Sequence, residues 1–266
     1  MIPILKKELG SKRTSLFVYC LAIYGLAWMY ISLYPTIQEQ SAVLSKTLES
    51  FGSGLKAFGI TDFGFDTLEK YLSVELFGIT WPLLVITFVA ARAGQALAGE
   101  TEKGTIGVLL ALPVRRTHIF LAKYFSGVIA LLIFVSVTVF ASPLIATVYG
   151  ISYSLNSFVL LWVICLLFSW ALYSLGMFLS AIFSEKGHVY LSIGGILMLM
   201  YVANIIAELN DKLSWLKYGS AFHYFSASEA LISNQISLPA VYVFGGTIIA
   251  FTLAGMAWFG KRDIIV

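Results

Sequence analysis

The chain has 266 residues, of which 59% are hydrophobic and only 12% are charged, and its mean hydropathy is +0.88. A soluble domain carries about 25% charged residues, so this composition excludes a water-soluble globular protein, a disordered chain and a collagen-like chain. The net charge of +3 is too small to indicate a nucleic-acid partner. We therefore expect an all-α polytopic membrane protein in which residues 1–266 form a single transmembrane domain.

Six apolar runs are long enough to cross a bilayer, because a helical crossing needs about 20 residues at a rise of 1.5 Å each. Helices are expected because they satisfy every backbone group within lipid, and because barrel strands are shorter. Pro82 and Pro143 lie within these runs and predict kinks or helix starts. The predicted spans are residues 15–34, 71–92, 124–149, 155–183, 189–207 and 239–260.

Basic residues are divided unevenly between the two sides that these spans define. With the N-terminus inside, the inner segments hold twelve Lys and Arg and the outer segments five, which together make the 17 of the chain. The positive-inside rule therefore predicts that both termini are cytoplasmic, as an even number of spans requires. The first run is expected to stay as a span, since no small-residue cleavage site follows it.

Three segments outside the spans have patterns of their own. Residues 1–14 place Ile4, Leu5 and Leu9 on one face among lysines, which predicts an amphipathic helix on the inner membrane surface or, alternatively, flanking positive charge alone. The outer segment 35–70 has apolar residues at helical spacing, which predicts an amphipathic helix. The outer segment 208–238 is rich in aromatic residues, which favours short interfacial or re-entrant helices.

The groups that catalysis or ion coupling needs are missing from the expected places. No ionisable residue lies near the centre of a predicted span, which argues against a self-sufficient pump or ion-coupled carrier. Cys20 and Cys165 lie within apolar runs, and the three histidines are isolated, so we expect no metal site and no catalytic residue. The segment 99–105 is not a phosphate loop, because Lys103 precedes Gly104 rather than following it. We therefore expect no enzyme activity and no ATP site in this chain.

The inner loop 93–118 is the most informative segment. Thr105 can begin a short apolar helix that Pro113 ends, and Arg115 and Arg116 follow at the membrane face. A helix of this length cannot span a bilayer. Exposed on the inner side it would need a partner groove, unless it packs under its own bundle.

These residues carry a resemblance to a known family. Glu100, Gly104-Thr105, Leu109-Leu110, Pro113 and Arg116, with Lys123 opening the third span, resemble the pattern of permease subunits of ABC transporters of the type-2 export family. Further resemblances are Lys7-Glu8-Leu9 before the first span, Asp62-Phe63 before the second and the aromatic segment 215–225 before the sixth. One departure is Arg115, a position at which the family often has Ser.

The resemblance implies a complex. Two permease subunits, identical or different, would pair in the cell membrane with two separate ATP-binding cassette subunits, which bind the ATP and Mg, so no cofactor is expected in this chain. The loop would contain the coupling helix that docks on the ATPase, and the turn 184–188 would make a second contact. The residues implied in coupling are Glu100, Gly104, Thr105, Leu109, Leu110, Pro113, Arg115 and Arg116.

The resemblance also implies that spans two and five line the translocation path. Candidate lining residues are Thr80, Trp81, Thr87, Phe88, Met198, Tyr201 and Asn204, with ordinary packing or lipid contact as the alternative for each. Since no ring of charge lines any span, the cargo of such an exporter is expected to be amphipathic or apolar: a lipid, a drug or an antimicrobial peptide. The other interpretations of the chain are a stand-alone channel or carrier and a non-transport membrane component.

Overall fold

The computed structural model describes residues 2–40, 65–111 and 113–262, and every regular element in these ranges is helical. Within these ranges, five helices are long and apolar enough to cross a membrane. A sixth crossing results if the bent pair of segments 68–78 and 81–94 counts as one span. The five are α2 (Arg13–Glu39), α9 (Arg116–Val148), α10 (Leu155–Ile182), α11 (Lys186–Leu209) and α14 (Leu238–Lys261). The chain is therefore a multi-pass membrane protein.

The bent pair is the second apolar run of the sequence. It consists of α5 (Leu68–Val74), the π-helical turn η1 (Glu75–Thr80) and α6 (Trp81–Gly94), with a bend of 41° between its halves. Pro82 lies in the first turn of α6, where its missing N–H costs nothing, so the helix start expected there is confirmed. By contrast, α9 continues through Pro143 to Val148.

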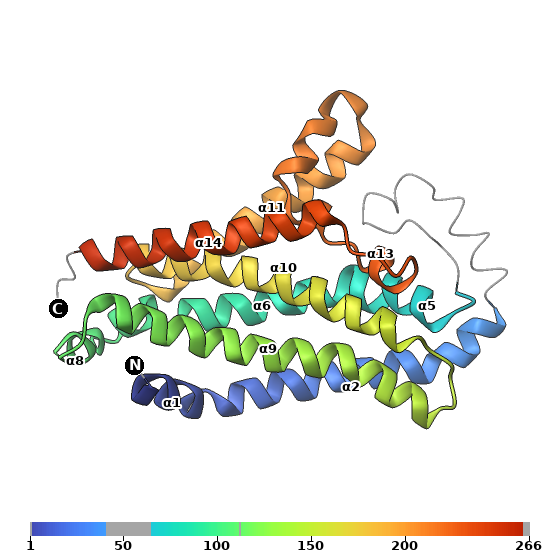
Figure 1. Cartoon of the computed structure of the whole chain (residues 1–266), viewed down its shortest axis with the longest axis horizontal. Helices are drawn as coiled ribbons and strands as arrows, with labels where there is room; N and C mark the ends of the chain where they lie inside the picture. The colour runs from blue at the N-terminus through green and yellow to red at the C-terminus, as the bar shows by residue number, and fades with distance from the viewer. Residues whose placement is uncertain (1, 41–64, 112, 263–266) are drawn as a thin grey trace.

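The long helices lie side by side in an elongated bundle (Figure 1). Helix α10 is central and contacts α6, α9, α11 and α14, while α2 packs on α9. The most apolar windows of α9 and α10 are each 61% buried, whereas those of α2, α11 and α14 are 17%, 22% and 17% buried. Helices α9 and α10 therefore form the core, and the other three expose most of their surface.

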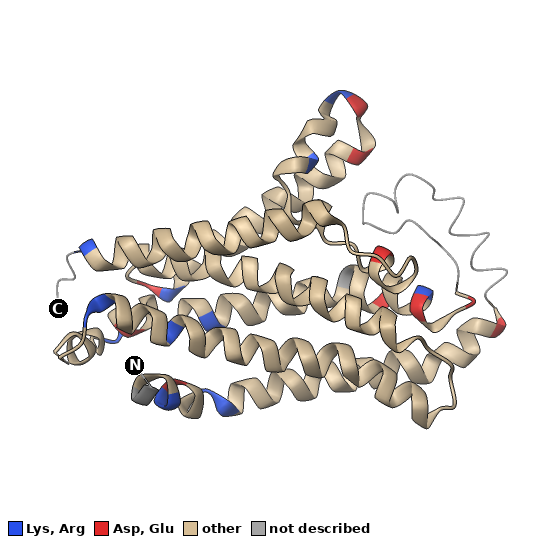
Figure 2. Cartoon of the chain, in the orientation of Figure 1, with Lys and Arg blue, Asp and Glu red and all other residues tan. Residues whose placement is uncertain are grey.

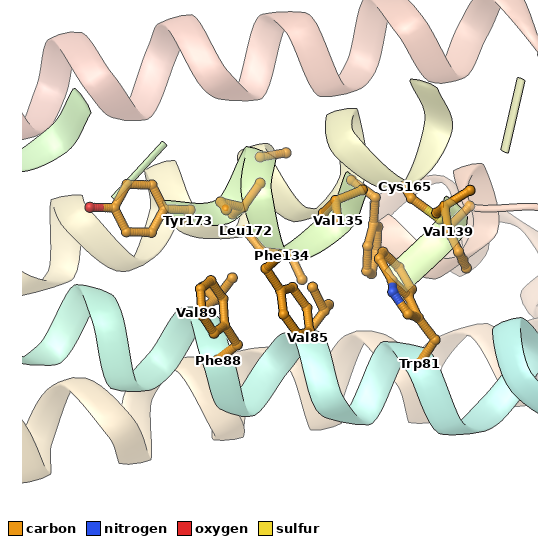
Figure 3. Packing of buried hydrophobic residues seen from close by; sticks show 14 of the residues in the cluster. Trp81, Val85, Phe88, Val89, Phe134, Val135, Val139, Cys165, Leu172 and Tyr173 are labelled. Carbon is orange, nitrogen blue, oxygen red and sulfur yellow. The ribbon is translucent and has the colours of Figure 1, made fainter. Parts of the chain in front are cut away.

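Aromatic side chains fill the contact between α6, α9 and α10 (Figure 3). Phe88 stacks on Phe134 with ring centroids 4.5 Å apart. Trp81 is fully buried and stacks on Phe225, from the segment before the last span, at 5.4 Å. Offset stacking of this kind adds to the contact between large apolar surfaces, so α6 is held firmly in the bundle.

Charged side chains concentrate at the two ends of the bundle (Figure 2). We call one end the basic end; it contains α1 (Ile2–Ser11), α7 (Ala98–Glu102), α8 (Ile106–Leu110), the 183–186 turn and the end of α14. The opposite end contains α5, η2 (Asp211–Gly219), α12 (Ala221–Tyr224) and α13 (Ala227–Leu231). The last part of helix α11 packs on η2, and the two project from the bundle as a hairpin.

Some of the predicted elements lie outside the described residues. The amphipathic helix expected within 35–70 falls mainly on residues 41–64, and so does Asp62-Phe63. Leu112 of the inner loop is also outside. Segment 208–238 contains the short helices η2, α12 and α13.

Candidate functional site

The loop between the second and third spans folds against the bundle at the basic end. The backbone N–H groups of Leu97 and Ala98 at the start of α7 donate to the Ser180 hydroxyl of α10, at 3.2 and 3.0 Å. Helix α7 ends at Glu102, and Gly104, two residues later, has φ +69°, a conformation that glycine adopts without strain. The chain can therefore reverse at this point and present α8.

A buried lysine joins three elements of the basic end. The Nζ of Lys123, on α9, lies 2.9 Å from the Glu100 carboxylate of α7 and 3.1 Å from the Glu8 carboxylate of α1. Lys12 makes a further ion pair with Glu8. The Lys123 side chain is only 1% exposed. We call Glu8, Lys12, Glu100 and Lys123 the charge node; it connects α1, α7 and α9.

Both carboxylates of the charge node are ionised at neutral pH. Burial alone raises the pKa of Glu8, but attraction to Lys123 and Lys12 outweighs it and lowers the pKa below its ordinary value. Burial likewise raises the pKa of Glu100, but hydrogen bonds from Lys123 and from the Thr105 hydroxyl outweigh it, so this pKa is also lowered. Each carboxylate is therefore a permanent anion beside a buried cation.

A second ion pair connects α7 to the opposite side of the basic end. Glu102 accepts from the backbone N–H of Lys186 at 2.9 Å and pairs with its Nζ at 3.1 Å, in the turn between α10 and α11. The hydrogen bond from the Lys186 N–H lowers the pKa of Glu102. Since residues two apart point to nearly opposite sides of a helix, Glu100 and Glu102 attach α7 to different elements.

Helix α8 has one face on the bundle and one face free. Ile106 is 1% exposed, and Leu109 and Leu110 are partly buried against the core, whereas the Val108 side chain is 72% exposed. The inner face of α8 therefore packs under its own bundle, as one of the two alternatives predicted, and the outer face does not. Helical spacing groups 106, 109 and 110 and separates 108, so this assignment was available from the sequence.

The predicted coupling residues divide in the same way. Glu100 and Thr105 bond to each other, and Arg116 donates to the Arg262 carbonyl, so their polar groups face their own chain. Gly104, Pro113 and Arg115 are exposed, and so is Val108, which was not among the predicted coupling residues. The exposed side of the loop is therefore apolar at its centre and basic at its edge.

A cavity of about 330 Å³ lies between the second and fifth apolar runs, towards the end opposite the basic end. Met198, Tyr201 and Asn204 of the candidate path line it. Its other lining residues come from α5, η1, α6, α11, α12, α13 and the residues joining them: Ser73, Phe77, Gly78, Pro82, Leu83, Ile86, Gly194, Leu197, Phe222, Phe225, Ala227 and Ser228. The aromatic segment 215–225 was the sequence signal for Phe222 and Phe225.

The remaining path candidates lie elsewhere in this subunit. Trp81 and Phe88 are in the packed core. The Thr80 hydroxyl lies 3.1 Å from that of Tyr30, and the exposed Thr87 bonds to the carbonyl of its own helix at Leu84. Within the described ranges, no group of three His, Cys, Asp or Glu residues is placed to hold a metal ion.

These features define a class: a multi-pass helical membrane protein with an intramembrane cavity and an anchored, partly exposed helix at one end. Residues 2–264 match the family described as ABC-2 family transporter protein, and the chain belongs to that family. It is therefore a membrane permease subunit of an ABC transporter, a type of subunit that associates with ATP-binding subunits. A comparison with curated proteins gives no match.

Proposed function

We propose that this chain is the permease subunit of an ATP-driven exporter in the cell membrane. Two permease subunits, identical or different, pair to form the path, and two separate ATP-binding cassette subunits bind ATP and Mg. The observation that carries this proposal is α8, whose exposed Val108 stands on a helix with a buried inner face. An apolar side chain in that position fits a groove on a partner protein.

The anchoring of α7 supports a role in transmitting movement. A helix that only bound a partner would need no rigid attachment, but α7 is attached to α9 and α1 through the charge node and to α11 through Glu102. Displacement of α8 by the ATPase would therefore move several spans together. Such coupling is reciprocal for binding free energies, so cargo is expected to change the affinity of the ATPase for ATP.

The orientation follows from charge. The basic end holds both the first helix and the end of α14, and most Lys and Arg of the described residues lie there (Figure 2). By the positive-inside rule we place this end, and with it both termini, in the cytoplasm. An ATPase that docks on α8 would then meet ATP in the correct compartment.

The cavity suggests the class of cargo. Its lining is mainly aromatic and aliphatic, and its polar side chains are those of Asn204, Tyr201, Ser73 and Ser228. Such a lining suits a molecule with a large apolar part and a few polar groups. We propose an amphipathic or apolar cargo such as a lipid, a drug or an antimicrobial peptide.

The experiment is purification of the chain from its native cells in mild detergent, followed by mass spectrometry of the proteins that accompany it. Val108→Asn is compared with Val148→Asn, because both valines are 72% exposed and Val148 ends α9 at the opposite end of the bundle. We expect an ATP-binding cassette protein to accompany the wild type and the Val148 variant. Burying the new amide costs about 1–3 kcal/mol, so the Val108 variant should retain about tenfold less.

Two results would contradict the proposal. If the wild type carries no ATP-binding cassette protein with ATP present, the chain works without an ATPase. If both variants retain the ATPase equally, docking does not use α8.

A further inference from the structure

The end of α14 is bonded to two other elements of the basic end through a single residue, Arg262. Its Nη1 donates to the carbonyls of Ala181 and Phe183, at 2.9 and 3.1 Å, and its Nη2 donates to the Ser184 hydroxyl at 2.6 Å. Its own carbonyl accepts from the Arg116 guanidinium at 2.5 Å. Arg262 thus bonds to the end of α10 and to the start of α9.

The three guanidinium bonds have a specific structural effect. The last carbonyls of a helix have no partner within the helix, and α10 ends at Ile182, so the Ala181 carbonyl needs an outside donor. The planar guanidinium supplies several donors in a fixed arrangement, which a lysine ammonium does not. The side chain therefore fixes the direction in which residues 183–186 leave α10.

Those residues carry the second attachment of α7. Lys186 begins α11, and both its N–H and its Nζ bond to Glu102. The position of Lys186 depends on the path of the turn, and the path of the turn depends on Arg262. A continuous series of polar contacts thus runs from α7 through the 183–186 turn to the end of α14.

Arg262 is also bonded to the residue that follows the loop containing α8. Arg116 is the first residue of α9, just after α8, and it holds the carbonyl of Arg262. Displacement of α8 would therefore reach the bundle by two routes. One passes through the charge node to α1 and α9, and the other passes through Glu102, Lys186 and Arg262 to α10, α11 and α14.

We propose that Arg262 is a positioning residue that holds the 183–186 turn against α7, so that the end of the last span transmits movement between the ATPase and the bundle. The transmission of movement rests on the proposed function, because it requires an ATPase. The effect of Arg262 on the 183–186 turn concerns this chain alone. The simpler role for Arg262 is that of a positive charge at the membrane surface, which the adjacent Lys261 would share.

The test compares Arg262→Lys, Arg262→Gln and the control Lys261→Gln. Arg262→Lys keeps the positive charge but loses the planar set of guanidinium donors. Lys261→Gln removes the positive charge of the neighbouring residue, whose side chain is exposed. The first readout is hydrogen exchange at the Lys186 amide in the chain alone, reconstituted in lipid nanodiscs. We expect exchange about tenfold faster in both Arg262 variants and unchanged in the control, because Lys186 N–H loses its fixed position against Glu102.

The second readout is the number of cargo molecules moved per ATP hydrolysed in the reconstituted complex. We expect both Arg262 variants to lower this ratio about tenfold while basal ATP hydrolysis is kept, and the control to match the wild type. Exchange and transport ratio both at wild-type values in Arg262→Lys would overturn the proposal. Faster exchange with an unchanged ratio would overturn its role in transmission. Hydrogen exchange tests whether Arg262 positions the 183–186 turn, and it needs no ATPase. Failure of the proposed function would appear instead as the absence of an ATPase from the complex.

Discussion

At the scale of single residues, Gly127 of α9 has the least room for a side chain among the described glycines. A Cβ at this position would lie 1.9 Å from the Tyr173 hydroxyl oxygen and 2.2 Å from its Cζ. Tyr173 is 1% exposed, and its ring lies against that of Tyr124 at 5.6 Å, so it cannot move aside. Gly127 therefore sets the distance between α9 and α10.

Replacing this glycine should loosen the core. We expect Gly127→Ala to lower the free energy of unfolding by about 1–3 kcal/mol, because the added methyl group forces α9 and α10 apart. Thermal unfolding of the purified protein in detergent measures this. The control is Gly246→Ala in α14, where an added Cβ would have no described atom within 4 Å and alanine favours the helix. Equal melting temperatures for the two variants would contradict the prediction.

At the scale of elements, the charge node decides how α1 and α7 are held. Lys123 is the only cation that the described contacts place on both Glu8 and Glu100. Residues 1–14 read as an amphipathic surface helix, but the structure adds an ionic attachment between α1 and the third span. This attachment depends on residues more than 100 positions apart in sequence, so periodicity could not reveal it.

Removing the shared cation should release both helices. In Lys123→Gln the two carboxylates lose a buried partner, and breaking a buried ion pair from one side costs about 3 kcal/mol. We expect faster hydrogen exchange in α1 and α7 and weaker coupling of ATP hydrolysis to transport. Lys103→Gln is the control, because Lys103 is exposed next to α7. Wild-type protection of α1 in Lys123→Gln would show that the charge node does not hold this helix.

At the scale of the whole molecule, the charge asymmetry predicts the orientation in the membrane. Cysteines are introduced singly as Lys261→Cys at the basic end and Lys212→Cys in η2, in a chain whose own Cys20 and Cys165 are replaced by Ala. On intact cells, we expect a membrane-impermeant maleimide to label position 212 and to reach position 261 only after permeabilisation. The reverse pattern would place the basic end outside and exclude docking of a cytoplasmic ATPase on α8.

The family and the helical membrane architecture follow from the linear sequence, because both depend on local properties. Runs of about 20 apolar residues must form helices in lipid whatever surrounds them. The same holds for the start of α6 at Trp81, next to Pro82, and for the short apolar helix that ends before Pro113. The motif from Glu100 to Arg116, combined with the resemblances elsewhere along the chain, indicated an ABC permease of the type-2 family, to which the chain belongs.

Tertiary structure decided which side of each helix packs in the core and which side is exposed. Trp81 and Phe88 were both candidate path residues, yet their rings stack on Phe225 and Phe134 in the core, because the neighbouring segments supply matching aromatic faces. Glu100 bonds inward to Lys123, while Val108 is the exposed side chain of α8. Partner choice of this kind depends on contacts between segments far apart in the chain, and a single sequence carries no record of those distances.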